Sequence, residues 1–190
     1  MHNSAKAYMK SLDDLREFCQ HDHLDLDKFL VPILKFAIKE TSSEIGVVGL
    51  VDDESQSWLR LRANHVVGSD PNQWMHGGSL ILPVGGKELS MSERSLSGYV
   101  AHTQKSYRSD NVIADAFYKS IDEQVQSELV VPIVKGRKIL GVISVESRTI
   151  YNYTEIHQEL LETIADIMSD RLEIFLQQDQ INYYFLPALK

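Results

Sequence analysis

Two runs rich in valine and isoleucine, separated by three turn-forming residues, constrain the fold of this chain more than any other feature. The runs are Leu129–Val134 and Ile139–Val145, and Lys135-Gly136-Arg137 separates them. β-Branched residues favour strands, and a short connection that contains glycine joins neighbouring antiparallel strands. The pattern therefore predicts a buried hairpin as the centre of a sheet.

A second hairpin and several helices complete the expected secondary structure. Glu44–Val51 is apolar and β-branched, an acidic turn follows it, and Trp58–Val67 alternates in polarity. Because strands and helices do not alternate, the order predicts an α+β fold with one antiparallel sheet. Helices are predicted over Ser11–Gln20, Leu26–Glu40 (capped by Asp27), Ser95–Thr103 (capped by Ser95) and Thr154–Gln180 (capped by Thr154), short strands at Leu80–Leu82, Glu88–Met91 and Ser106–Val112, and a helical turn within Ala116–Gln126.

Length and charge limit the classes of function. The 190 residues carry a net charge of −8, and one of them is a cysteine. The length suggests one domain with an extension, and the acidity opposes general binding to a phosphate backbone. A lone thiol suggests a reducing compartment, and the sequence has neither a signal peptide nor a membrane-spanning apolar run. We therefore expect a cytoplasmic protein that binds neither nucleic acid nor membrane.

Three motifs in the second half of the chain resemble a GAF domain. SLSGYVAHTQKSYRSDN resembles the family's short helix and following strand, FYKSIDE resembles a stretch of the cyclic-nucleotide phosphodiesterase members, and SELVVPIVKGRKILGVISVES resembles the closing hairpin. The resemblance covers about Leu26–Gln178. It divides the chain into an N-terminal helical extension (1–25), a GAF domain (26–178) whose long helix runs over 153–180, and an apolar tail (179–190).

The resemblance implies a six-stranded antiparallel sheet with helices on one face, which serves as a dimer platform. On the other face it implies a lidded pocket for a small molecule. The function it implies is that of a non-catalytic sensory or regulatory domain, which dimerises through its terminal helices and signals to a partner protein. The ligand-binding positions carried over from the family are Leu96, Ser97, Gly98, Asp110, Tyr118, Asp122 and Ser144. Gly98 is also expected to permit close packing of its short helix.

Two alternatives remain open at this point. In the first the ligand is a cyclic nucleotide, because Tyr118 could stack on a purine and Asp122 could accept a purine N–H. Against it, Val112 stands where those phosphodiesterases have lysine, and Ser144 stands where some have glutamate. In the second alternative Phe117 and Tyr118 fill the pocket, and the domain is a ligand-free dimerisation module.

We expect no enzyme activity, cofactor or metal. The free-methionine-sulfoxide reductases that resemble GAF domains use thiols within the domain, whereas Cys19 precedes it. His65, His76 and His102 are expected at surface or capping positions, and His21-Asp22-His23 in a solvated linker. An anionic ligand would require Arg60, Arg62 or Arg108 to reach the pocket.

The long C-terminal helix suggests a second subunit. Leu160, Ile167 and Ile174 recur every seven residues, as do Leu161, Met168 and Phe175, so the apolar stripe is wider than one sheet requires. We expect part of this stripe to pair with the N-terminal helices of another copy. The alternative is that the helices of the same chain cover it.

Overall fold

The fold is known from a computed structural model, which describes residues 2–21, 25–52, 55–68, 80–91, 93–118 and 122–185. For residues 2–10 and 179–185 only the backbone is described. The predictions for His23, for His76 and for the side chains of the apolar tail therefore lie outside the described residues. No helix within these ranges combines the length and the apolar character that a membrane crossing requires.

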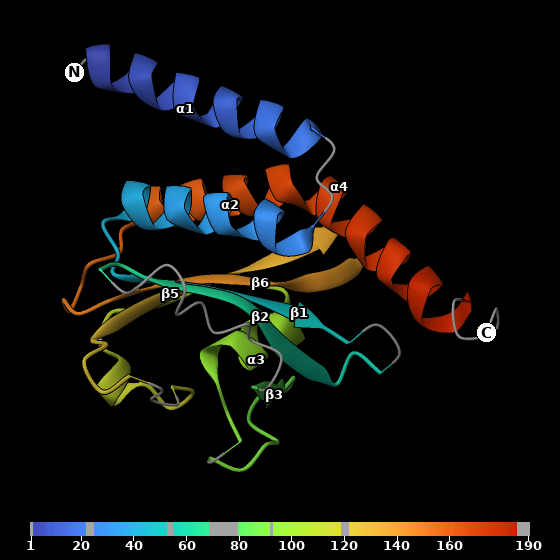
Figure 1. Ribbon diagram of the computed structural model, residues 1–190. Helices are drawn as coiled ribbons and strands as arrows, with labels where there is room; N and C mark the ends of the chain where they lie inside the picture. Colours follow the sequence, from blue (N-terminus) through green and yellow to red (C-terminus); the bar gives the residue numbers. More distant parts are fainter. Residues whose placement is uncertain are drawn as a thin grey trace.

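A single six-stranded sheet forms the centre of the molecule, with strand order β3-β2-β1-β6-β5-β4 and antiparallel neighbours throughout (Figure 1). The two predicted hairpins are therefore confirmed, and they lie side by side because β1 pairs with β6. The strands are β1 (Ile45–Val51), β2 (Trp58–Val66), β3 (Ile81–Pro83), β4 (Tyr107–Ser109), β5 (Ser127–Lys135) and β6 (Lys138–Ser147).

Long helices lie on one face of this sheet, and a short helix lies on the other (Figure 1). Helices α2 (Leu26–Thr41) and α4 (Glu155–Phe185) cover the first face, and α1 (His2–Gln20) lies across them as an outer layer. Helix α3 (Leu96–Thr103) packs on the opposite face. The expected α+β architecture is thus confirmed.

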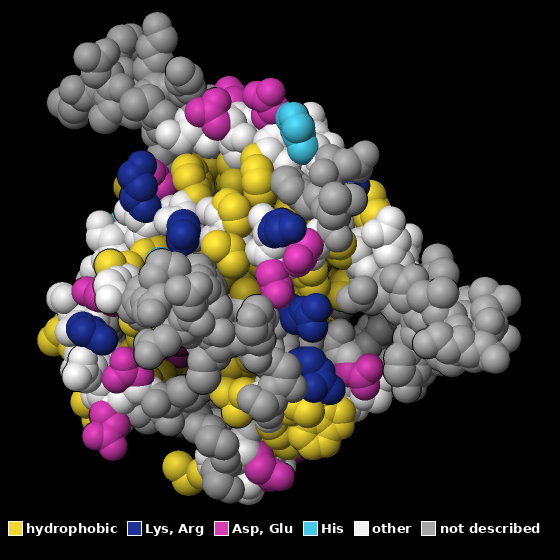
Figure 2. All heavy atoms as spheres, viewed as in Figure 1, with side chains coloured by type: hydrophobic (Ala, Val, Ile, Leu, Met, Phe, Trp, Pro, Cys, Tyr) yellow, Lys and Arg dark blue, Asp and Glu magenta, His cyan; other side chains and the backbone are white. Residues whose placement is uncertain are grey.

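The main core fills the space between the sheet and the covering helices. Alternate residues of β5 and β6, such as Leu129, Val131 and Val145, point toward this core and are fully buried. Figure 2 shows acidic side chains on the outer surface of the uppermost helix and hydrophobic side chains beneath it. Helix contributions to the core include Phe29, Leu30, Ile33 and Leu34 from α2, Leu161, Ile164 and Met168 from α4, and Leu12, Leu15 and Cys19 from α1.

Several local predictions need correction. Asp25, and not Asp27, caps α2, and its carboxylate accepts a hydrogen bond from the Asp27 N–H at 2.8 Å. Helix α1 begins well before Ser11. The predicted strand at Glu88–Met91 is wrong: the described residues there form turns, held by Arg94, whose guanidinium donates to the carbonyls of Lys87 and Leu89.

The segment after β4 also differs from the prediction. Strand β4 has three residues, and the helical turn is a 3-10 turn, η2 (Val112–Ala114), which precedes the predicted range. Asn111 caps this turn by accepting from the Ile113 N–H. An asparagine cap of this kind satisfies a backbone donor locally, so it decides where the turn begins.

Candidate functional site

A small cavity lies on the α3 face of the sheet. Its volume is about 40 Å³, and both strand and helix residues line it. The lining consists of Val47, Leu61, Leu82, Ser95, Leu96, Ser97, Tyr118, Glu128, Ser144 and Glu146.

The alternation of side chains along the strands places the polar lining. On β5, Glu128 lies on the face opposite to its neighbour Leu129, which points into the main core. On β6, Ser144 and Glu146 share the cavity face, and Val145 between them points the other way. The central hairpin therefore presents a polar row to one side and an apolar row to the other.

A β-bulge sets the register that brings the two glutamates together. The pairing shifts between Ile133 and Val134, so that Glu128 lies directly opposite Glu146. Residues directly opposite in an antiparallel pair have Cβ atoms about 4.5–5.5 Å apart. Two carboxyl groups therefore face the same small space.

The start of α3 forms another wall of the cavity. The Ser95 hydroxyl caps this helix by accepting from the Gly98 N–H at 3.0 Å, as predicted. Leu96 and Ser97 follow in the first turn and line the cavity. A Cβ on Gly98 would lie 2.2 Å from the Pro83 carbonyl oxygen, so only glycine lets α3 approach β3 this closely.

An aromatic cluster holds the segment that leads to Tyr118. The Phe117 ring stacks on Tyr99 with centroids 4.2 Å apart, and Tyr107 packs edge-on against Tyr99. Asp115 ties the same segment down, because it accepts from the Tyr107 hydroxyl at 3.0 Å and from the Phe117 N–H at 2.9 Å. Burial and the hydrogen bond to the Asp115 carboxylate raise the pKa of Tyr107 to about 12. The hydroxyl therefore stays a donor at neutral pH.

The two glutamates give the cavity its electrostatic character. The Glu128 side chain is buried, at 5% exposure, and no described residue donates a hydrogen bond to its carboxyl group. Burial and the nearby Glu146 and Asp115 raise its pKa well above the usual range. Burial and Asp122 raise the pKa of Glu146 to about 7. The cavity thus holds two glutamates that lose their protons at a higher pH than glutamates usually do.

Sequence reasoning missed both glutamates, although a signal was present. Glu128 comes directly before the apolar run of β5, and Glu146 lies two residues after Ser144, on the same face of β6. An acidic residue within a strand that is buried on both faces is rare, because the charged form is costly to bury. That rarity could have marked Glu128 as a candidate.

The structure brings together four of the seven predicted ligand-binding residues, Leu96, Ser97, Tyr118 and Ser144. The other three lie outside the cavity lining. Gly98 serves the packing just described, Asp110 pairs with Arg108 at 3.6 Å, and Asp122 pairs with Arg148 at 3.7 Å and accepts from the Gln124 N–H.

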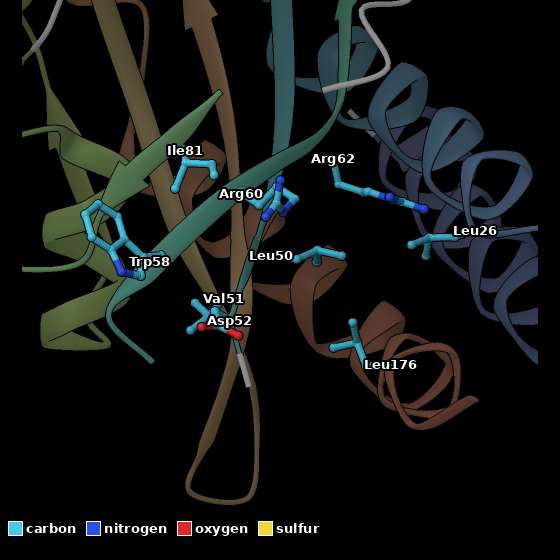
Figure 3. A pocket seen from close by; sticks show the side chains of 9 residues that line it. All are labelled: Leu26, Leu50, Val51, Asp52, Trp58, Arg60, Arg62, Ile81 and Leu176. Carbon is cyan, nitrogen blue, oxygen red and sulfur yellow. The ribbon is translucent and has the colours of Figure 1, made fainter. Parts of the chain in front are cut away.

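The arginines that an anionic ligand would need lie elsewhere. Arg60 and Arg62 line a larger hollow of about 500 Å³, open to solvent, on the other face of the sheet. Figure 3 shows Arg62 reaching from β2 toward Leu26 of α2, with Leu176 of α4 nearby. The side chains of Trp58 and Ile81 are exposed at the rim of the hollow. The small cavity has no arginine in its described lining.

The remaining chemical candidates do not gather at the cavity. Over the described ranges, no three His, Cys, Asp or Glu side chains come close enough to hold a metal ion. Cys19 is buried in the main core, on the far side of the sheet from α3, and burial raises the pKa of its thiol to about 12. Burial and the charge of Lys35 lower the pKa of His65.

Comparison with known proteins gives a consistent picture. The sequence profile of the GAF domain family matches residues 23–173. No curated protein sequence matches the chain. Among solved structures, the GAF domain of a Coxiella burnetii phosphoenolpyruvate-protein phosphotransferase superposes with a TM-score of 0.73 at 15% identity, over 90% of this chain and 96% of that one.

Two further structures are similar at the level of the fold. The GAF domain of the Acinetobacter phosphoenolpyruvate-protein phosphotransferase has a TM-score of 0.68 at 20% identity, over 90% of this chain and 97% of that one. A free methionine-R-sulfoxide reductase from Neisseria meningitidis, in complex with its substrate, has a TM-score of 0.72 at 19% identity, over 92% and 93%.

Proposed function

The chain belongs to the GAF domain family, whose members are sensory and regulatory domains that bind small molecules, and we propose that it is a non-catalytic cytoplasmic sensor of this kind. It binds a small molecule in the cavity between α3 and the β1–β6–β5 strands and forms a homodimer through its terminal helices. Ligand binding orders the described parts of the lid, 110–118 and 122–127, and changes how the terminal helices engage a partner protein. Such a signal requires the ligand to bind two conformations with different affinity.

The observation that carries this proposal is the polar cavity itself. A domain that served only as packing material would fill this space with apolar side chains, as the main core does. Here Ser97, Ser144 and two glutamates line it instead. Burying a carboxyl group without a partner costs free energy, so a site that keeps two of them supports a binding role.

The placement of the thiol supports a non-catalytic role. Two of the similar structures are free methionine-R-sulfoxide reductases. Their sequence identities to this chain, 15% and 19%, support a shared fold and not a shared activity. In this chain the single cysteine, Cys19, is buried among α1, α2 and α4. A thiolate is the reactive form, and a pKa near 12 leaves almost none of it at neutral pH.

The cavity argues against a cyclic nucleotide as the ligand. Its volume of about 40 Å³ accommodates a few heavy atoms, and a purine nucleotide would need the lid to open widely. The phosphate would then face Glu128 and Glu146 with no arginine in the described lining. Once these carboxyl groups are ionised, they repel a phosphate strongly in a site with little water.

Helix α4 supports the proposed dimer. Helix α1 of the same chain covers part of its apolar stripe, yet Ile174 remains 42% exposed. A hollow of about 350 Å³ runs between α1 and α4, lined by Ile167 and Ile174 with Arg16, Asp166, Asp170 and Arg171. An apolar centre with a charged rim is the usual composition of a protein–protein interface.

The small cavity volume also favours a second candidate, a structural dimerisation module without ligand. Native mass spectrometry of freshly purified protein separates the two. The sensor is expected to carry a retained small molecule or to gain mass on incubation with a metabolite extract, and to have the mass of two chains. A dimer that never gains mass supports the module. A monomer by light scattering at micromolar concentration contradicts the dimer in both.

A further inference from the structure

We infer that Glu128 and Glu146 together hold the ammonium group of a small primary amine. The inference rests on the proposed sensory function and narrows its ligand to one chemical class. It follows from the position of the two side chains, the burial of Glu128, and the absence of a positive partner among the described residues around them.

The first step is geometric. Glu128 on β5 and Glu146 on β6 are directly paired across the hairpin and both line the cavity. Ionising both of these opposed carboxyl groups is costly unless a cation lies between them, because like charges directly opposite destabilise a sheet. A cation bound in the cavity would remove that repulsion.

The second step is that Glu128 has no partner among the residues that the structure describes. It is 5% exposed, it lines the cavity, and no described side chain or backbone group hydrogen-bonds its carboxyl oxygens. Buried polar groups in native proteins almost always have a partner. A side chain of this kind, at the wall of a cavity, therefore points to a ligand that supplies the donor.

The third step concerns the charged groups around the pair. The charge of Asp115 raises the pKa of Glu128 and that of Asp122 raises the pKa of Glu146, so the acids on the neighbouring segment add negative potential. Arg148 is paired with Asp122, and the Tyr153 hydroxyl lies on the opposite side of the sheet, bonded to Ser43. The part of α3 that lines the cavity contributes Leu96 and Ser97, which carry no charge. The described surroundings thus supply no cation of their own.

The fourth step selects an ammonium group. An –NH₃⁺ group has three donors and no acceptor, which matches two carboxylates and one hydroxyl. The hydroxyls of Ser144 and Ser97 line the same cavity. A volume of about 40 Å³ admits an ammonium with the first carbons of its chain. A divalent cation would need six or more oxygen ligands, or at least a third strong protein ligand. The described lining offers only two carboxylates, so it suits a divalent cation less well than an ammonium group.

The test titrates the full chain with ethylamine, the smaller of the two amine probes. Binding is measured from the chemical shifts of the backbone amides. A ligand of three heavy atoms reaches a Kd of about 1 mM at best. We expect ethylamine and ethanolamine to perturb amides of β1, β5 and β6, and ethylene glycol and propionate to leave them unchanged. Because the ligand needs ionised carboxylates, its Kd should fall about tenfold or more between pH 5.5 and pH 8.

Isosteric variants identify the groups responsible. Glu128→Gln and Glu146→Gln keep the side-chain shape and remove the charge, and each should raise the Kd of ethylamine about tenfold or more. Glu159→Gln, on an exposed position of α4, is the matched control and should leave it unchanged. The shift dispersion of each variant verifies that it is folded.

Four results would overturn the inference. They are no ethylamine binding at tens of millimolar, equal binding of ethylene glycol, unchanged affinity in both glutamine variants, or Ca²⁺ binding that exceeds ethylamine and is lost in the same variants. If one of these occurs while native mass spectrometry still finds a bound molecule, the sensory function stands and only the ligand class is wrong. If no molecule binds at all, the proposed function fails with it.

Discussion

Glu128 on β5 lies directly opposite Glu146 on β6, and both carboxyl groups face a cavity of about 40 Å³. Cross-strand neighbours of like charge are destabilising when both are ionised. The pair therefore links the stability of the free protein to pH, and it also provides the site at which a ligand would act.

The first prediction is that the free protein becomes less stable as pH rises from about 5 to about 8. Burial raises the pKa of Glu128 and brings that of Glu146 from 4.5 to about 7. Over this range the folded state holds protons that the unfolded state has released, so the free energy of unfolding falls with increasing pH. About half of the free energy that this shift in pKa implies for Glu146, on the order of 2 kcal/mol, corresponds to a fall in Tm of roughly 4–8 °C.

Thermal unfolding over this pH range checks the prediction against Glu128→Gln, Glu146→Gln and the control Glu159→Gln. The first two variants should flatten the pH dependence, and the control should follow the wild type. A wild-type Tm that rises steadily to pH 8 would contradict the assignment of the raised pKa values.

The second prediction concerns Gly98. Alanine usually stabilises a helix relative to glycine, but here its Cβ would lie 2.2 Å from the Pro83 carbonyl oxygen. Gly98→Ala should therefore cost about 1–3 kcal/mol, which lowers the Tm by roughly 3–10 °C. Gly86→Ala is the matched control, because its nearest neighbour is the flexible end of Glu88 at 3.2 Å. Equal Tm values for the two variants would show that α3 does not approach β3 this closely.

The third prediction concerns a buried hydroxyl chain between α2 and the start of α4. The Tyr153 and Ser43 hydroxyls are 2.9 Å apart, and Ser43 in turn contacts Thr41 at 2.7 Å. Tyr153→Phe should lower the free energy of unfolding by about 0.5–1.5 kcal/mol, measured by chemical denaturation. Tyr151→Phe, whose side chain is 69% exposed, should change it little. The prediction is wrong if both substitutions have the same small effect.

The fourth prediction is that Cys19 is unreactive in the folded protein. It is 5% exposed, and its pKa is raised to about 12. Labelling by a disulfide reagent near pH 8 should be roughly 100-fold slower than in guanidinium chloride, because the thiolate is the reacting form. An exposed thiol at Glu17→Cys, in a Cys19→Ala background, should react as fast folded as unfolded. Rapid labelling of Cys19 in folded protein would show that α1 does not stay packed on α2 and α4.

The fifth prediction concerns the proposed dimer. Ile174 is 42% exposed beside the hollow between α1 and α4. Ile174→Asp should shift the mass measured by light scattering from two chains to one, because burying the new carboxylate in an interface is costly. Ile156→Asp, near the start of α4, alters a residue that is 72% exposed and lines no part of that hollow, and it should leave the mass unchanged. Dissociation by both variants would place the interface elsewhere.

Local patterns in the sequence were sufficient for the fold. The valine- and isoleucine-rich runs of β5 and β6 predict a hairpin because strand preference and turn chemistry act over a few residues. Ser95 predicts the start of α3 for the same reason, since a cap acts within three residues. The motifs between Ser95 and Ser147 then predicted the family and, through it, a six-stranded antiparallel sheet.

Only the tertiary structure decided which side chains meet at the cavity. A hairpin counted from its Gly136-Arg137 turn would place Glu128 opposite Val145, and the bulge after Ile133 moves it opposite Glu146. A shift of one residue changes the face that a side chain occupies, so no local pattern could fix this pairing. Asp110 and Asp122 show the converse, because their likeness to family positions said nothing of the nearby Arg108 and Arg148 that engage them. The sequence by itself determined the elements and their order, and long-range register determined the chemistry of the site.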